Sequence, residues 1–138
     1  MNFEQCIERV LMWEAGYSHH AQDPGGETNF GITKKFYPHL DIKNLTRAQA
    51  IEIYRKDYWD KNKLEKVPVY LRLAFFDAVV NQGPGGAVKA LQRALRFKGR
   101  DVDMVFGPKT EDALMKAGVG IVVRFLAERM TLYTENTT

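Results

Sequence analysis

The chain has 138 residues, of which 45% are hydrophobic and 12% aromatic, so it can build one compact domain and does not belong to the disordered class. Its net charge of +3 is unevenly placed: residues 1–65 hold nine Lys and Arg against ten Asp and Glu, and residues 66–138 hold eleven against seven. The mild basic excess of the second half suits an anionic polymer as partner, and an ordinary solvated surface explains it about as well. Nucleic-acid binding is disfavoured because the sequence has no recognisable motif for it and no dense basic stripe.

Apolar residues recur at helical intervals from Phe3 to Leu11, which predicts an amphipathic helix over residues 3–14. Glu14 ends this helix about three turns after Phe3, so it falls on the apolar stripe. Partial desolvation and the negative end of the helix dipole both raise the pKa of a carboxyl group there. Such a group suits a general acid in a glycoside-cleaving site. The alternative is a solvated glutamate at a frayed helix end.

A polar, glycine-rich loop follows this helix. Asp23-Pro24-Gly25-Gly26 is a strong turn signal, and residues 28–33 favour a short strand or the edge of a hairpin. We expect little other β structure. The loop also brings a second carboxylate close to Glu14 in sequence, and paired carboxylates are what glycoside cleavage requires.

Capping and turn signals divide the rest of the chain into helices. Thr46 with Gln49 three residues later is a capping-box pattern, and Gly83-Pro84-Gly85-Gly86 is expected to break a helix. We predict helices over residues 46 to about 61, Val69 to Val80, Val88 to about Gly99, Pro108 to Gly118, and Val119 to about Tyr133.

The run from Val69 to Val80 is apolar at almost every position, which is typical of a buried central helix. Asp77 and Asn81 are its polar exceptions and lie four residues apart on one face. Buried polar groups need partners or face a cleft. The pair therefore either caps neighbouring backbone or lines a cleft opposite Glu14.

Cysteine and histidine usage favours neither a metal nor a cofactor. The single cysteine, Cys6, excludes an internal disulfide and is expected to be a small packing residue on the first helix. His19 and His20 are adjacent and therefore do not converge on one metal, and His39 is the only other histidine. We expect these three residues in solvated loops.

Four blocks of the sequence carry a resemblance to a known family: Glu14–Tyr17 with Asp23–Thr33, Ala50–Asp60, Phe76–Pro84, and Leu91–Leu95 with Val102–Thr110. Together they resemble glycoside hydrolase family 108, the muramidases of phages and prophages. The resemblance implies an all-α, mainly helical, lysozyme-like fold with at most a short β-hairpin near residues 23–33. It also implies a single domain over residues 1–138, with a catalytic lobe over 1–65 and a helical lobe over 66–138 that resembles a peptidoglycan-binding region.

The activity implied by the resemblance is that of a lysozyme-type endolysin. Such an enzyme cleaves the β-1,4 bond between N-acetylmuramic acid and N-acetylglucosamine in bacterial peptidoglycan. The key glutamate of the family maps onto Glu14, which would protonate the glycosidic oxygen. The spacing to Asp23, with Thr28 nearby, is similar to the acid–carboxylate–threonine arrangement of other phage lysozymes. Asp23 would then stabilise the oxocarbenium-like transition state or help to activate water, and Thr28 would orient that water.

Four further residues are predicted to bind substrate. Tyr17 and Phe30 would flank a sugar ring, and Asp77 and Asn81 would bind N-acetyl or hydroxyl groups. Two alternatives stay open: a lytic transglycosylase, which forms an anhydro product without water, and a non-catalytic wall-binding module carried by the basic second half.

The sequence also bears on where the protein acts. The N-terminus lacks a basic stretch followed by an apolar one, and the apolar runs are too short to span a membrane. We therefore expect no signal peptide and no membrane insertion. The expected protein is a monomer that accumulates in the cytoplasm of an infected bacterium and acts on the cell wall in the periplasm after release.

Overall fold

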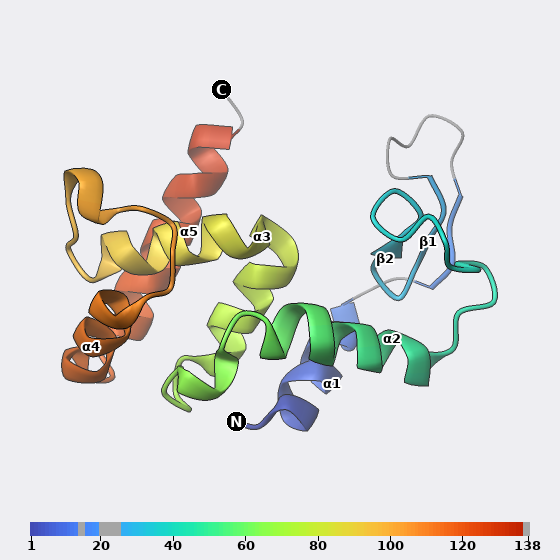
Figure 1. Cartoon of the computed structure of the whole chain (residues 1–138), viewed down its shortest axis with the longest axis horizontal. Helices are drawn as coiled ribbons and strands as arrows, with labels where there is room; N and C mark the ends of the chain where they lie inside the picture. Colours follow the sequence, from blue (N-terminus) through green and yellow to red (C-terminus); the bar gives the residue numbers. More distant parts are fainter. Residues whose placement is uncertain (14–15, 20–25, 137–138) are drawn as a thin grey trace. The chain divides into compact units, whose positions relative to one another are not determined.

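The computed structural model describes residues 1–13, 16–19 and 26–136 (Figure 1). Helices predominate within these ranges, and their one sheet is a two-stranded antiparallel hairpin, which confirms the predicted mainly helical fold. None of the described helices combines the length and apolarity that crossing a bilayer requires. The chain forms two compact units, one over Phe3–Lys56 and the other over Met1–Asn2 with Asp57–Thr138.

The unit Phe3–Lys56 contains two helices and the hairpin. Its elements are α1 (Phe3–Trp13), β1 (Thr28–Asn29), β2 (Ile32–Thr33) and α2 (Arg47–Ile53). The described part of the first helix and the position of the hairpin agree with the sequence prediction. The apolar face of α1 is buried at Phe3, Cys6, Ile7 and Val10, so Cys6 is the packing residue that was expected.

Two arginines connect α1 with the segment that begins at α2. Arg47 forms an ion pair of 2.9 Å with Glu8, and Arg55 pairs with Glu4. The Arg55 guanidinium also lies 4.3 Å from the centre of the Phe3 ring, where a cation–π attraction operates. Because exposed ion pairs contribute little individually, burial of the apolar face supplies most of the stabilisation of α1, and the arginines fix its direction.

The helix predicted over residues 46–61 begins as expected but changes type. Thr46 Oγ1 accepts a hydrogen bond from the Gln49 backbone N–H (3.1 Å), and Gln49 Oε1 accepts one from the Thr46 N–H (2.8 Å), which completes the capping box. From Tyr54 the backbone continues as a π-helix, Tyr54–Asp60. The predicted extent of the helix is therefore confirmed, whereas the change to a π-helix was not predicted, because hydrophobic spacing does not reveal a change in the turn size of the backbone.

The unit Asp57–Thr138 is built around α3 and α5, which lie side by side (Figure 1). Aromatic rings form much of its interior. Phe75 packs against Phe125 and Phe106 with ring centres 5.8 and 6.1 Å apart, and Trp59 packs edge-on against Phe76 at 5.2 Å. The helical elements of this unit are η2 (Leu64–Lys66), α3 (Arg72–Ala94), η3 (Gly99–Asp101), α4 (Pro108–Ala117) and α5 (Ile121–Asn136).

The central helix α3 differs from its prediction at both ends. It begins at Arg72, and Val69 precedes it with 58% of its surface exposed. The expected break occurs at Gly83, whose φ of 80° lies in the left-handed region that glycine tolerates. The chain then resumes a helix at once, because Pro84 suits a first helical position where no backbone N–H is needed. It ends at Ala94, earlier than the predicted residue 99.

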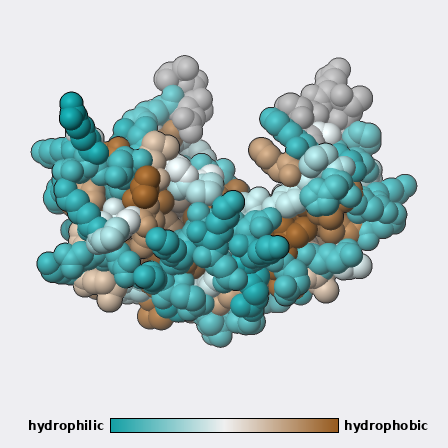
Figure 2. Space-filling model, viewed as in Figure 1, coloured by the Kyte–Doolittle hydropathy of each residue, from teal (hydrophilic) through white to brown (hydrophobic). Residues whose placement is uncertain are grey.

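The start of α4 and its end confirm two capping predictions. Gly107 is the N-cap residue and Pro108 occupies the first turn. Gly118 follows the last turn with a φ of 73°, which explains why a glycine ends this helix. In the view of Figure 2 the surface is mainly hydrophilic with separate hydrophobic patches, as expected for a compact domain.

A buried glutamine organises the loop between α3 and α4. Gln92 is 1% exposed, and its Nε2 donates to Asp103 Oδ1 (2.8 Å), Val105 O (3.1 Å) and Thr110 Oγ1 (3.0 Å). Its Oε1 accepts from the Met104 N–H at 3.0 Å. One side chain therefore holds the loop 103–105 and the start of α4 against α3.

The same hydrogen bonds lower the pKa of the Asp103 carboxyl group. The Gln92 amide is the largest cause and the Val105 N–H is the next. A carboxyl pKa that is lower in the folded than in the unfolded chain stabilises the fold above the unfolded pKa. This contribution disappears as the pH falls through the folded pKa.

We predict that Gln92→Leu lowers the free energy of unfolding by about 1–3 kcal/mol, because it leaves the buried Thr110 hydroxyl and the part-buried Met104 N–H without their partner. Urea denaturation followed by circular dichroism measures this change, and Arg9→Leu on the exposed side of α1 is the control. In the folded variant, NMR titration of Asp103 should show its pKa closer to the ordinary value. Equal stabilities of Gln92→Leu and Arg9→Leu would contradict the role of Gln92.

Candidate active site

The hairpin that follows α1 has a tight, conformationally demanding turn. Thr28 of β1 lies opposite Thr33 of β2, and Phe30 and Gly31 connect the strands with φ values of 52° and 78°. Two consecutive left-handed residues match a type I′ turn, the usual connection of a two-residue hairpin. A left-handed conformation costs phenylalanine roughly 1–2 kcal/mol. The Tyr54 hydroxyl supports it by donating a 2.7 Å hydrogen bond to the Phe30 carbonyl.

The side chain of Asn29 attaches the hairpin to the segment before α2. It is 6% exposed, and its amide Nδ2 donates to three carbonyl oxygens, those of Ile42, Lys43 and Leu45, at 3.0, 3.3 and 3.5 Å. An amide nitrogen donates two hydrogens and carries no charge that would have to be buried, so it suits a buried cluster of carbonyl oxygens. The position of β1 is therefore set from within the unit Phe3–Lys56.

A third segment pairs with the outer side of β1. The Ser18 N–H donates to the Thr28 carbonyl at 2.8 Å, and the Thr28 N–H donates to the Ser18 carbonyl at 2.9 Å. Beside this bridge, the Tyr17 hydroxyl donates to Glu27 Oε2 at 2.8 Å, and this hydrogen bond raises the pKa of Tyr17. Sequence reasoning did not find the contact of Glu27 with Tyr17, since only strand pairing brings the two residues together.

The predicted catalytic and aromatic residues fall into two groups. Tyr17, Thr28 and Phe30 are gathered on the hairpin and its bridging segment, as a common site requires. Glu14 and Asp23 lie outside the described residues, so their geometry stays a prediction. The backbone of Thr28 is fixed by its hydrogen bonds to Ser18 and by its pairing opposite Thr33.

The predicted substrate-binding pair on α3 is engaged with its own unit. Asn81 Nδ2 donates to the Asp77 carbonyl (3.1 Å) and to Asp77 Oδ1 (3.0 Å), while Arg129 donates to Asp77 Oδ2 (3.0 Å). Arg129 also donates to Gln82 Oε1 at 2.7 Å, which links α5 to α3. These contacts agree with the alternative in which the pair bonds to neighbouring groups of its own helix. Sugar binding by Asp77 and Asn81 stays a prediction.

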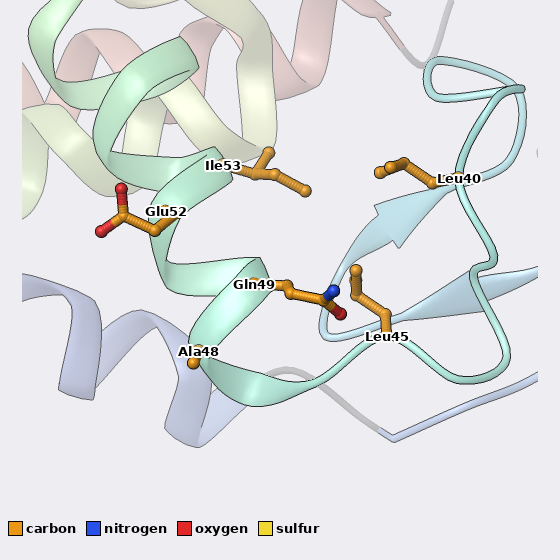
Figure 3. A pocket seen from close by; sticks show the side chains of 6 residues that line it. All are labelled: Leu40, Leu45, Ala48, Gln49, Glu52 and Ile53. Carbon is orange, nitrogen blue, oxygen red and sulfur yellow. The ribbon is translucent and has the colours of Figure 1, made fainter.

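A pocket of about 380 Å³ lies between α2 and the preceding loop. Figure 3 shows Leu40 and Ile53 pointing toward one another from its two sides, with Leu45 and Gln49 beside them. Glu52 is the ionisable member among the described lining residues, and its carboxylate points away from Leu40. The pocket therefore suits an apolar group rather than a proton transfer.

The described residues contain no group of three or more His, Cys, Asp and Glu side chains arranged to hold a metal ion. His19 and His39 are exposed, as expected for loop residues, and His20 lies outside the described ranges.

The mainly helical chain, with a short hairpin as the next described element after its first helix, has a lysozyme-like fold. Among solved structures, the chain is similar to SagA of Brucella abortus, with 32% identity and a TM-score of 0.80 over 96% of this chain and 79% of that chain. The family model described as glycosyl hydrolase 108 matches residues 7–83. The chain therefore belongs to glycosyl hydrolase family 108, as the sequence blocks predicted. A search of curated proteins found no match.

We predict that Asn29→Asp lowers the free energy of unfolding by about 2–4 kcal/mol at pH 7, because a buried carboxylate would face three carbonyl oxygens. The loss should be smaller at pH 4, since burial raises the pKa of such a carboxyl group and its protonated form can donate. Urea denaturation at the two pH values measures both effects. Parent-like stability at pH 7 would show that the amide does not anchor the hairpin.

Proposed function

We propose that this chain is a peptidoglycan hydrolase of the N-acetylmuramidase type. It cleaves the β-1,4 bond between N-acetylmuramic acid and N-acetylglucosamine. The observation that carries the proposal is the hairpin with Thr28 and its neighbouring aromatic residues, the next described element after α1 in a chain of glycosyl hydrolase family 108. Family membership supports glycoside cleavage, and the basic second half suits an anionic wall polymer.

Glu14 is the proposed general acid. It follows α1, whose face is buried at Phe3, Ile7 and Val10, and partial burial of a carboxyl group favours the protonated form that an acid needs near neutral pH. Its proton passes to the glycosidic oxygen as the bond to the sugar breaks. A positioned proton donor of this kind contributes on the order of 10²–10⁴ to the rate.

Asp23 and Thr28 are the proposed partners of the attacking water. Asp23 stabilises the positive charge that develops on the sugar ring or accepts a proton from water. Thr28 orients that water through its hydroxyl group. Its backbone N–H and carbonyl are both hydrogen-bonded to Ser18, and it lies opposite Thr33 in the hairpin. Such backbone support matters because small displacements of a reacting group cost large factors in rate.

Tyr17 and Phe30 are the proposed sugar-flanking residues. Tyr17 is 41% exposed and its hydroxyl is fixed by Glu27, so an open aromatic surface is available without further ordering. Phe30 lies at the turn of the same hairpin. In this proposal the protein acts as a monomeric phage-type endolysin that reaches the cell wall after release from the host cytoplasm and lyses the cell.

We predict that Glu14→Gln lowers the rate of clearing of chloroform-treated Gram-negative cells by at least about 10², because the variant keeps the shape of the side chain and removes the proton. Glu52→Gln on the exposed surface of α2 is the matched control and should clear at the parent rate. Circular dichroism confirms that both variants fold. Clearing by Glu14→Gln at the parent rate would refute the assignment of the acid.

We predict that products of the parent enzyme are heavier by one water than the anhydro products of a lytic transglycosylase, as measured by mass spectrometry of released muropeptides. Anhydro products from the parent would identify a transglycosylase. Binding to purified sacculi with no bond cleavage would identify a wall-binding module.

Thr28→Val should lower the hydrolysis rate by about tenfold or more, whereas Thr28→Ser, which keeps the hydroxyl, should lower it much less.

A further inference from the structure

A second pocket, of about 220 Å³, lies within the unit Asp57–Thr138. Three segments that are far apart in the sequence line it. They are the turn that contains Lys61 and Lys63, the part of α3 that follows its break, and the loop 104–106 that precedes α4. None of the roles proposed for the hairpin site uses these residues.

The backbone around this pocket is held in an unusual conformation. Lys63 and Met104 have φ values of 58° and 65°, which cost a residue with a Cβ roughly 1–2 kcal/mol each. Gly83, with a φ of 80°, directly precedes Pro84 of the pocket wall. Non-glycine residues stay in this region only where the surrounding structure holds them, and such positions cluster at ligand sites.

Specific hydrogen bonds stabilise the backbone around the pocket in this conformation. Gln92 accepts from the Met104 N–H and donates to the Val105 carbonyl, so the 104–105 backbone is fixed on α3. Lys63 Nζ donates to the Phe106 carbonyl at 3.3 Å, which joins the turn at residues 61–63 to the same loop. The pocket is therefore already formed without a ligand.

The chemistry of the lining combines two cations with an apolar wall. Lys61 and Lys63 contribute ammonium groups, and Pro84, Val88 and Met104 contribute apolar surface. No carboxylate belongs to the lining, and within residues 1–13, 16–19 and 26–136 neither lysine forms an ion pair. Neither ammonium group is used in an ion pair among the described residues, so the pocket favours an anion attached to a short aliphatic group.

The pocket is small, with a volume of about 220 Å³, which suits one carboxylate with a few carbon atoms. We propose that this pocket binds a carboxylate-bearing residue of the peptide stem of peptidoglycan, with Lys61 and Lys63 pairing the carboxylate and Met104 and Val88 contacting the aliphatic part.

This inference rests on the proposed function, since a glycan strand carries peptide stems on its muramic acid residues. A stem-binding pocket gives the chain an attachment point for the wall polymer besides the proposed glycan site. An additional attachment point raises the affinity for a polymer without any change at the reacting bond. The pocket would thus give preference for peptide-substituted wall over bare glycan.

The methionines allow a direct test by NMR. The chain has five methionines, of which Met104 lines the pocket while Met115 and Met130 are exposed on α4 and α5. Titration of ¹³C-methyl-methionine protein with the soluble peptide L-Ala-γ-D-Glu-diaminopimelate should shift the Met104 methyl signal and leave those of Met115 and Met130 in place. Equal shifts at all three, no shift at Met104, or the same shift with inorganic phosphate at equal concentration would overturn the stem assignment.

Charge-removing variants test the two lysines. The double variant Lys61→Gln/Lys63→Gln should weaken peptide binding by about tenfold or more, because it removes both charge-assisted partners of the carboxylate. Lys116→Gln, on the surface of α4, changes the net charge without touching the pocket and should bind as the parent does. Equal weakening by Lys116→Gln would mean that the peptide senses net charge alone, and the proposal would fail.

Activity assays separate this inference from the proposed function. For each protein, the cleavage rate on stem-bearing sacculi is divided by the rate on glycan stripped of peptides. This ratio should be lower for the double lysine variant than for the parent. If the parent cleaves both substrates and the peptide leaves the Met104 signal unchanged, peptide binding in the pocket is refuted and the muramidase proposal stands. If the parent cleaves neither substrate and the peptide still shifts the Met104 signal, the muramidase proposal is refuted and peptide binding stands.

Discussion

The amide of Asn29 is the contact on which the geometry of the hairpin depends. It fixes β1 against three carbonyl oxygens of the segment 42–45, and the Tyr54 hydroxyl fixes the following turn at Phe30. A two-stranded hairpin alone is marginally stable in water. These two polar anchors therefore let a short sheet hold Thr28 in place, and the catalytic assignment relies on that rigidity.

Local signals in the sequence predicted much of the helical framework. The capping box at Thr46 and Gln49 was confirmed because it depends on residues three apart, and Pro108 and Gly118 marked the limits of α4 because their backbone preferences are intrinsic. The hairpin was also expected from its turn residues. Family resemblance predicted the membership that the match over residues 7–83 established.

Contacts between distant residues were not accessible from the sequence. Nothing near Gln92 in the chain indicates that its side chain will organise a loop more than ten residues away. Tyr54 begins a π-helix although its apolar spacing fits an α-helix. At the candidate site the sequence placed Tyr17 and Thr28 in one loop, but their strand pairing and the support of Phe30 follow from tertiary hydrogen bonds.

The position of Cys6 has an experimental consequence. It is the single thiol of the chain, and it is fully buried on the apolar face of α1. A thiol reagent reaches such a sulfur only when the helix separates from its neighbours, so the labelling rate measures the free energy of that local opening. The residue directly after α1 is Glu14, and the alkylation kinetics of one cysteine would therefore report how firmly the segment that carries the proposed acid is seated.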